Sequence, residues 1–312
     1  MDLKMAALTS ENFSEIVRVE NPSLPNKNIL QIYEKKATSE TILKNVGVIT
    51  PNGQLVGYGM FAAGPWDPIL KPGYAEVSIK IDDEWHGKRI EGWILKEIEE
   101  LALKNKTKVL QTQIQDINEA ELEWARKEGF EISGHIFESQ LDLSIIKTDS
   151  YSSLINELTS SGIKFTTLAD YPPDPSIQER FWDLWWELAQ DVPGMSDKPR
   201  PENEQMINLT KDYDKKGFIL AVQGGEWVAM SMVLQEAAGT GYNSMTGVHP
   251  QYRGRGLAKA IKVKAIEYAL QNGMKFLRTN NDSINEPMLA VNQRLGYEQK
   301  PGFYILTKRL DD

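Results

Sequence analysis

The chain has 312 residues, of which 41% are apolar and 25% charged, as in an ordinary globular protein, and this length predicts two domains of roughly 150 residues. It contains no cysteine, which excludes a disulfide framework, a cysteine zinc site and a thiol nucleophile. The net charge of -9 argues against broad nucleic-acid binding, and no apolar run is long enough to cross a bilayer. We expect a cytoplasmic monomer or homodimer without nucleic-acid, membrane or metal partners.

Apolar periodicity and turn residues predict a mixture of helices and strands in the first half. Ile16 and Ile32 mark short helical segments near the start. The following elements are a hairpin over 46–61, a strand over 75–81, a helix ending near 105, a strand over 108–113, a helix over 119–128 and a strand near 136–143.

The second half is expected to repeat this order. Its elements are a helix over 151–159, a strand over 163–168, a helix over 178–190, a hairpin over 218–235, a strand over 242–248, a helix over 257–271, a strand over 275–279, a helix over 286–295 and a strand near 303–307. In the helix over 257–271, Lys259, Lys262 and Lys264 stand between the apolar positions.

Individual residues of the two halves correspond at a fixed offset of 167 positions. The matching pairs are Gly87 and Gly254, Asn118 and Asn285, and Phe130 and Tyr297. An ungapped series that also follows the element order indicates a tandem duplication of one α/β unit. We expect a first domain over 1–147 and a second over 148–312.

The stretch 245–260 has the composition of an anion-binding turn between a strand and a helix. Such a turn leaves backbone amides unpaired at the positive end of the helix dipole, where they favour a pyrophosphate. Gly254 and Gly256 allow the backbone to approach the anion closely, and Arg253 and Arg255 add positive charge.

The hexapeptide Gln251-Tyr252-Arg253-Gly254-Arg255-Gly256, between Val248-His249-Pro250 and Leu257-Ala258, resembles the acyl-CoA-binding motif of the GNAT superfamily of N-acyltransferases. The family motif is Gln or Arg, two residues, Gly, one residue, then Gly or Ala. The resemblance implies an α/β fold of two tandem GNAT-like domains, each with a mixed, mostly antiparallel central sheet flanked by helices. It also implies acetyl-CoA as co-substrate and direct transfer of the acetyl group to the amine of a small molecule or peptide in a ternary complex.

By the same resemblance, acetyl-CoA is expected to contact a defined set of residues. They are Gly247, Val248, Arg253, Gly254, Arg255, Gly256, Leu257, Ala258, Asn285 and Asn292.

The groups that transfer protons are harder to assign. Many relatives have a Tyr at the position of Asn292, and that Tyr protonates the departing CoA thiolate. Because Asn cannot act as an acid, Tyr304, Tyr297 and Tyr242 are alternatives, of which we select Tyr304. Glu236 and Asp191 are the alternatives for the base that accepts a proton from the amine.

The first copy departs from the motif. Arg89 stands at the position of Gly256, and the acidic run Asp82-Asp83-Glu84 precedes the turn, so a phosphate would meet a side chain and three carboxylates. We expect this copy to have lost acyl-CoA binding, although Arg89 contacting a phosphate is the alternative. For the whole chain the alternatives are an acyl-CoA-binding or sensing protein without catalysis and a purely structural module.

Overall fold

A computed structural model describes residues 2–9, 12–20, 39–64, 67, 70–236 and 239–310. Ile16 lies in a helix as expected, whereas the helical segment expected around Ile32 lies outside the described residues. The chain forms two compact units, Met1–Gly134 with Phe303–Asp312 and His135–Gly302. Among the described residues, none of the helices combines the length and the apolar character that crossing a membrane requires.

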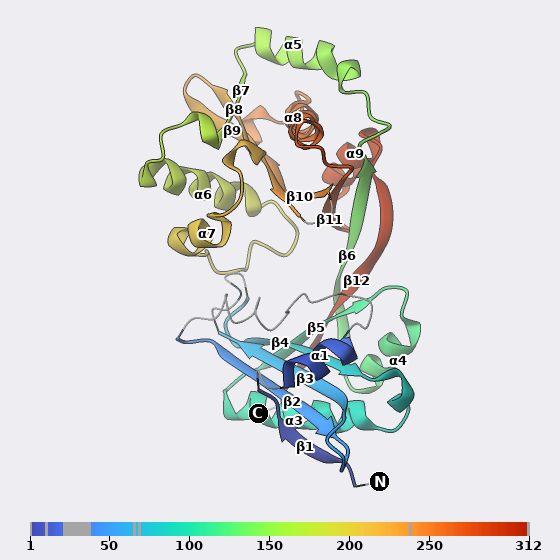
Figure 1. Cartoon of the computed structure of the whole chain (residues 1–312). Helices are drawn as coiled ribbons and strands as arrows, with labels where there is room; N and C mark the ends of the chain where they lie inside the picture. The colour runs from blue at the N-terminus through green and yellow to red at the C-terminus, as the bar shows by residue number, and fades with distance from the viewer. Residues whose placement is uncertain are drawn as a thin grey trace. The chain divides into compact units, whose positions relative to one another are not determined.

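The first unit is a sheet with the strand order β1-β2-β3-β4-β5-β12-β6, in which β4 and β5 run parallel and the other registered pairs run antiparallel (Figure 1). The elements that begin in it are β1 Lys4–Ala7, α1 Phe13–Glu20, β2 Ile42–Ile49, β3 Leu55–Ala63, β4 Tyr74–Ile81, η2 Asp83–Trp85, α3 Ile90–Lys104, β5 Val109–Gln115, α4 Glu119–Lys127 and β6 Glu131–Asp142.

The second unit has the strand order β12-β6-β11-β10-β9-β8-β7, and here β10 and β11 are the parallel pair. Its elements are η3 Thr148–Tyr151, α5 Ser152–Ser160, β7 Lys164–Thr167, η4 Leu168–Asp170, α6 Pro175–Ala189, α7 Asn203–Thr210, η5 Lys215–Gly217, β8 Phe218–Gln223, β9 Glu226–Gln235, β10 Thr240–Val248, η7 Pro250–Tyr252, α8 Leu257–Gln271, β11 Phe276–Asp282, α9 Glu286–Arg294 and β12 Glu298–Arg309. The mixed, mostly antiparallel sheet flanked by helices is therefore confirmed.

The internal repeat extends to the boundaries of the elements. At the offset of 167 positions, the limits of η2, α3, β5, α4 and β6 coincide with those of η7, α8, β11, α9 and β12. The helix α7 was not predicted from the sequence, because Asn203–Thr210 is short, polar and preceded by two prolines, Pro199 and Pro201.

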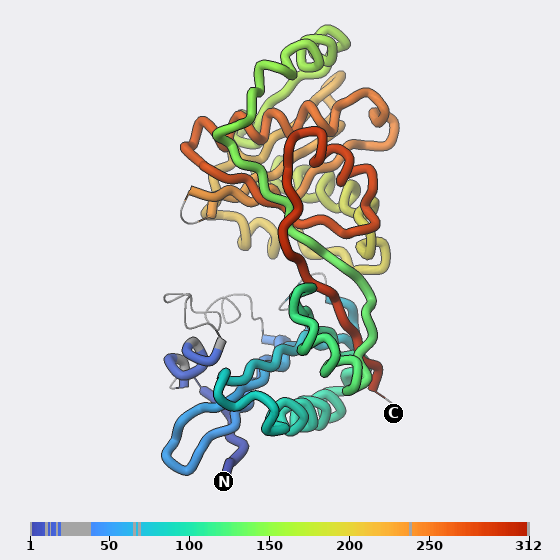
Figure 2. The backbone as a smooth tube through the Cα atoms, turned by 90° about the vertical axis from the view of Figure 1, so that its right-hand side faces the viewer, coloured from blue at the N-terminus to red at the C-terminus, as the bar shows by residue number. Residues whose placement is uncertain are grey.

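Each unit completes its sheet with a strand from the other half of the sequence. Phe303–Arg309 of β12 pairs with β5 in the first unit, whereas Ile136–Asp142 of β6 pairs with β11 in the second. Figure 2 shows β6 in green and β12 in red running side by side. Both strands are consequently 12 residues long, longer than predicted, and the unit boundaries differ from the expected division at residue 147.

Two apolar layers enclose the sheet of the second unit. Phe218 and Leu220 of β8 belong to the cluster that contains α6, whereas Ile219 and Ala221 belong to the cluster that contains α8. This alternation follows from the two-residue period of a strand, and it places α6 and α8 on opposite faces (Figure 1). The loop that follows β10 is thus anchored at one end by the sheet and at the other by a buried helix.

Candidate functional site: the turn between β10 and α8

The motif stretch forms a strand, a tight turn and a helix, as expected. Pro250 begins the single 3₁₀ turn η7, and Gly254 and Gly256 then take positive φ angles of 75° and 79°. The helix α8 starts at Leu257, whose side chain is buried. Since a positive φ is readily adopted by glycine, the two glycines allow the chain to turn sharply into α8.

Backbone amides accumulate at this turn without internal partners. Within the described residues, the first amide after Arg253 that donates to a backbone carbonyl is that of Ala260, which bonds Gly256 O at 3.0 Å. The preceding amides, from Gly254 to Lys259, lie at the N-terminus of a 15-residue helix, where the helix dipole is positive. A Cβ added at Gly254 would meet no atom within 4 Å, so the turn is open there. This arrangement is suited to an anion such as a diphosphate.

The strands β10 and β11 separate as they approach the turn. They pair in parallel only from Thr240 with Phe276 to Tyr242 with Arg278. Beyond that point β10 continues to pair with β9 up to Val248, after a bulge between Asn243 and Met245. The edge of β10 that contains Gly247 and Val248 is therefore free of a neighbouring strand on the β11 side.

The two arginines of the turn are already in contact with the protein. Arg253 Nε donates to Val248 O at 2.9 Å, and its Nη2 forms an ion pair with Asp191. Arg255 Nη2 lies 3.0 Å from Ser161 Oγ. Asp191, a predicted base, is thus brought next to the turn, but a guanidinium binds its carboxylate.

Glu236, the other predicted base, is also paired. Arg278 Nη2 lies 2.6 Å from Glu236 Oε2, and its Nη1 lies 2.8 Å from Glu138 Oε2. Tyr242 lies beside this group, and burial, followed by the charge of Glu236, raises the pKa of its hydroxyl. A proton on Tyr242 is therefore harder to remove than on a tyrosine in water.

The structure does not bring Tyr304 together with these residues within one unit. Tyr304 follows Phe303 on β12, pairs with Ile114 of β5 and packs against the core of the first unit. The hydroxyl of Tyr297 lies in the second unit, but it is buried without a hydrogen-bond partner, and burial raises its pKa strongly.

Asn285 and Asn292 lie on the helix after β11. Asn285 caps α9 by accepting a hydrogen bond from Met288 N at 3.4 Å. Asn292 is only 2% exposed, and its Nδ2 donates to Asn281 Oδ1 at 2.6 Å while its Oδ1 has no partner. The position at which many relatives have a tyrosine is therefore an inward-facing amide.

A histidine–carboxylate pair escaped the sequence reasoning. His249 Nε2 lies 3.1 Å from Glu187 Oε1 of α6, and the imidazole also packs edge-on against Tyr252. Its Nδ1 is buried without a partner. The sequence offered no signal for this pair, because 62 positions separate its members.

The corresponding turn of the first unit has the same backbone path but different side chains. Gly87 has φ 77° and Arg89 has φ 63°, directly before α3. Asp82 caps η2 and pairs with Arg18, and this hydrogen bond is the main reason that the pKa of Asp82 lies below its usual value. Strand β4 pairs with β3 in unbroken register from Ala75 to Ile81, without a bulge.

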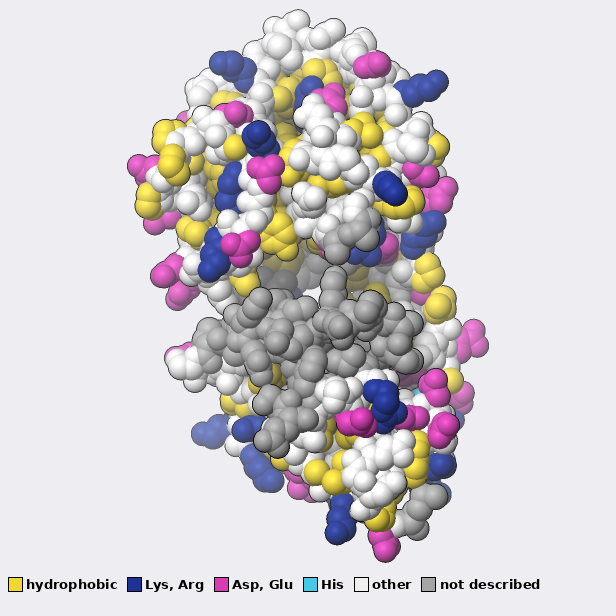
Figure 3. Space-filling view, viewed as in Figure 1, with side chains coloured by type: hydrophobic (Ala, Val, Ile, Leu, Met, Phe, Trp, Pro, Cys, Tyr) yellow, Lys and Arg dark blue, Asp and Glu magenta, His cyan; other side chains and the backbone are white. Residues whose placement is uncertain are grey.

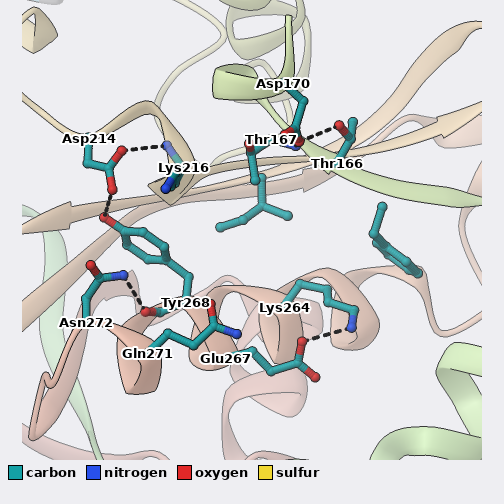
Figure 4. Close-up of a pocket in the computed structure, with 12 residues that line it drawn as sticks. Thr166, Thr167, Asp170, Asp214, Lys216, Lys264, Glu267, Tyr268, Gln271 and Asn272 are labelled. Carbon is teal, nitrogen blue, oxygen red and sulfur yellow. Dashed lines mark hydrogen bonds and ion pairs between the residues drawn. The ribbon is translucent and has the colours of Figure 1, made fainter.

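A cavity of about 560 Å³ lies elsewhere on the second unit, between β7, η5 and the C-terminal half of α8 (Figure 4). Its polar groups bind one another: Tyr268 Oη donates to Asp214 at 3.2 Å, and Lys264 pairs with Glu267 at 2.8 Å. The cavity contains none of the residues that the sequence assigned to the site. Among the described residues, no cluster of three or more His, Asp or Glu side chains is arranged to hold a metal ion.

The surface of the second unit shows no single basic patch in the view of Figure 3, where Lys and Arg side chains are interspersed with acidic and apolar ones. At the turn itself, positive charge is supplied by the N-terminus of α8 and by Arg253 and Arg255.

Comparisons with known proteins agree with this geometry. Residues 179–297 match the model of the Acetyltransferase (GNAT) family. A segment of 114 residues is 28% identical to Acetyltransferase SG1711 of Sodalis glossinidius, over 36% of this chain and 79% of that protein. The structure is similar to a GCN5-related N-acetyltransferase from Sphaerobacter thermophilus, with a TM-score of 0.74, 17% identity and coverage of 98% and 95% of the two chains.

It is also similar to a tandem GNAT protein from the clavulanic acid biosynthesis pathway, with a TM-score of 0.71, 18% identity and full coverage of both chains. The similar structures show that the chain has the GNAT fold, and the family match lies in its second half. Residues 179–297 match the model of this family, and the whole chain has a fold similar to that of a tandem GNAT protein. The family match and the similarity to a curated acetyltransferase support N-acetyltransferase activity in general.

Proposed function

We propose that the second unit binds acetyl-CoA and transfers its acetyl group to the amine of a small molecule or peptide. One observation carries the proposal: consecutive free amides open the 15-residue helix α8 directly after a strand that has separated from its parallel neighbour. The amides from Gly254 to Ala258 would bind the diphosphate, with Arg253 and Arg255 at the rim. The exposed backbone of Gly247 and Val248 would pair with the pantetheine arm as a strand does.

The chemistry that these residues support is direct acyl transfer. The neutral amine attacks the thioester carbonyl, a nitrogen–carbon bond forms, the carbon–sulfur bond breaks, and the thiolate takes a proton. An amide of the free β10 edge near Val248 would polarise the carbonyl, and holding both reactants in one site supplies much of the rate. The roles of Glu236, Asp191 and Tyr304 in proton transfer, and of Asn285 and Asn292 in cofactor binding, stay predictions, and the ion pairs of Glu236 and Asp191 argue against these two carboxylates as the base.

We propose that the first unit has no acyl-CoA site. Arg89 places a side chain where the second unit has Gly256, and the carboxylates of Asp82, Asp83 and Glu84 precede the turn. The absence of a bulge in β4 supports the same conclusion, because its pairing with β3 stays in register throughout.

A second candidate function is acyl-CoA binding without catalysis. It is favoured by Asn292, a buried amide that cannot protonate a thiolate, and by the ion pairs that already engage Glu236 and Asp191. Release of free CoA in the presence of amines distinguishes the two functions, since a sensing protein binds acetyl-CoA and releases none.

The deciding experiment is calorimetric titration of the full chain with acetyl-CoA, followed by measurement of CoA release across a panel of primary amines. We expect one binding site per chain and turnover with at least one class of amine. Absence of binding rejects both candidate functions. Binding without turnover across the panel rejects the enzyme and supports acyl-CoA binding without catalysis.

A further inference from the structure

The bulge of β10 is filled by a cluster of buried polar side chains. Its members come from four elements: Ser231 of β9, Asn243 and Thr246 of β10, Lys262 of α8 and Thr279 of β11. All but the half-buried Thr246 are less than 9% exposed. A buried cluster of this kind is stable only when its groups bind one another, so its contacts show what it holds in place.

Asn243 is the centre of the cluster and joins the two strands across the bulge. Its Nδ2 lies 3.0 Å from Met232 O of β9 and 3.1 Å from Met245 O of β10. Met232 and Met245 are the first pair after the register shift. The side chain of Asn243 therefore binds backbone carbonyls of both strands next to the irregularity, where a bulge disrupts the regular ladder.

Asn243 also contacts Ser231 Oγ at 3.0 Å and Thr246 Oγ1 at 3.2 Å, and two more contacts reach it from β11 and α8. Thr279 Oγ1 of β11 donates to Asn243 O at 2.9 Å, one position beyond the last parallel pair of β10 and β11. Lys262 Nζ of α8 donates to Asn243 Oδ1 at 2.7 Å. The orientation of the Asn243 amide is thus set from the neighbouring strand and from the helix.

Lys262 is an unusual residue for a helix core. It is 1% exposed, and among the described residues no carboxylate forms an ion pair with its amine. The ring of Tyr297 lies 4.9 Å from Nζ, and burial lowers the pKa of the amine to about 7. Burying an amine without an acid is costly, so filling space alone does not account for a lysine rather than an apolar residue here.

The first unit serves as an internal comparison because it lacks both the bulge and the cluster. The positions that correspond to Ser231, Thr246 and Lys262 are occupied by Gly59, Ile79 and the buried Leu95. Strand β4 has eight residues and β10 has nine, so the extra residue of β10 and the polar side chains occur together.

We propose that Lys262 is a positioning residue: through Asn243 it holds the bulge, and the bulge orients the free edge of β10, from Met245 to Val248, for binding the acyl-CoA thioester. The proposal rests on the proposed function, because the edge concerned is the one proposed to bind acetyl-CoA. Lys262 itself does not touch the reacting atoms.

The test compares three variants of the full chain at one pH. Lys262→Met keeps the length of the side chain without a donor, Lys262→Gln keeps a neutral N–H donor, and Leu95→Met is the matched substitution in the first unit. Two quantities are measured, namely amide hydrogen exchange of peptides covering β9 and β10 and the kinetic constants for acetyl-CoA.

For Lys262→Met we expect exchange over Asn243–Val248 to accelerate by about tenfold and KM for acetyl-CoA to rise by a similar factor, with kcat within about threefold. Lys262→Gln recovers part of both losses, and Leu95→Met changes neither. If Lys262→Met does not fold, Lys262→Gln is compared with the wild type instead. Amide hydrogen exchange over Asn243–Val248 is then again expected to be slower in the wild type.

Exchange and KM that stay within about twofold of the wild type in both Lys262 variants would overturn the proposal, because the lysine would then only fill space. Failure of the wild type to bind acetyl-CoA would instead reject the proposed function. The exchange comparison decides the role of Lys262 in that case as well, since it needs no ligand.

Discussion

Gly256 and Arg89 occupy the same left-handed backbone conformation at equivalent positions of the two units, with φ angles of 79° and 63°. The backbone of this turn therefore accepts a side chain. What differs is the surroundings, because a Cβ added at Gly256 would lie 2.9 Å from Leu154 Cδ1 of α5. Gly256 is therefore not needed for the turn to form, and its proposed role is to let a ligand approach the backbone closely.

The first prediction concerns Gly256→Arg, which copies the first unit. The new side chain lies among the free amides, so we expect affinity for acetyl-CoA to fall by at least about tenfold and CoA release to be abolished. We expect the unfolding free energy to fall by only about 1–2 kcal/mol, for a left-handed non-glycine residue and displacement of Leu154. Calorimetry and denaturation measure the two effects.

The matched control is Arg89→Gly in the first unit, which should leave acetyl-CoA affinity unchanged. Retained wild-type affinity in Gly256→Arg, or a loss in Arg89→Gly, would place the site elsewhere.

The second prediction concerns Asp191→Asn. The ion pair with Arg253 is half-exposed, with 51% and 45% of the two side chains accessible, and it competes with an anionic ligand for the guanidinium. Removing the carboxylate should tighten acetyl-CoA binding by about two- to fivefold, the size of an exposed ion pair, and leave kcat within about threefold. Titration calorimetry and steady-state kinetics give both values. Asp183→Asn, which breaks the exposed pair between Asp183 of α6 and Arg200, should change neither.

A fall in kcat of about a hundredfold in Asp191→Asn, with the fold intact, would contradict this and identify Asp191 as the base.

The third prediction concerns Glu236→Gln. Because Arg278 binds both Glu236 and Glu138, the carboxylate of Glu236 is occupied. These side chains are about one-third exposed, so we expect a loss of only about 0.5–1 kcal/mol in unfolding free energy. We expect kcat to stay within about threefold. Glu138→Gln, on the other side of the same guanidinium, is the control and should behave alike. A much larger loss of kcat in Glu236→Gln alone would show that Glu236 leaves Arg278 to accept the proton.

The sequence predicted the elements around the turn well because their signals are local. The repeat at 167 positions, the apolar period of α8 and the glycines at 254 and 256 each depend on residues close in the chain. The sequence could not predict that β6 pairs with β11 of the second unit and β12 with β5 of the first. Because β6 and β12 are equivalent in the repeat, either strand could form the same antiparallel pairing with β5 or β11. This is why the predicted boundary at 147 differs from the observed units.

The interior of the site was not predictable for a related reason. Lys262 stands among other lysines of α8, and its sequence context is typical of a solvated helix face, yet its side chain is buried. The bulge arises from one extra residue in β10, and Asn243 compensates for it through contacts with three other elements. Such tertiary contacts have no signature in a single sequence. The ion pairs of Asp191 and Glu236 were missed for the same reason.

The last prediction is a pH dependence of stability that arises from Lys262. Burial lowers the pKa of this amine from 10.5 to about 7 in the folded chain, whereas the unfolded chain keeps the ordinary value. Between these two values the unfolded state binds about one more proton, so the contribution of Lys262 to the unfolding free energy rises with pH by about 1.4 kcal/mol per unit. Below pH 7 both states are protonated, and the contribution is constant. Tyr297, the titratable group beside the amine, ionises only above this window because burial raises its pKa.

Lys262→Met removes this slope. Relative to the wild type, the unfolding free energy of the variant should be most favourable at pH 7. This advantage should shrink by about 1.4 kcal/mol per pH unit towards pH 9. Loss of the hydrogen bond to Asn243 lowers the unfolding free energy of the variant by an amount that does not change with pH. Denaturant unfolding at pH 7, 8 and 9 measures it, with Leu95→Met as the control that shows no change with pH. A pH-independent difference between Lys262→Met and the wild type would show that the amine remains charged when buried, and that α8 holds a cation rather than a neutral donor beside the bulge.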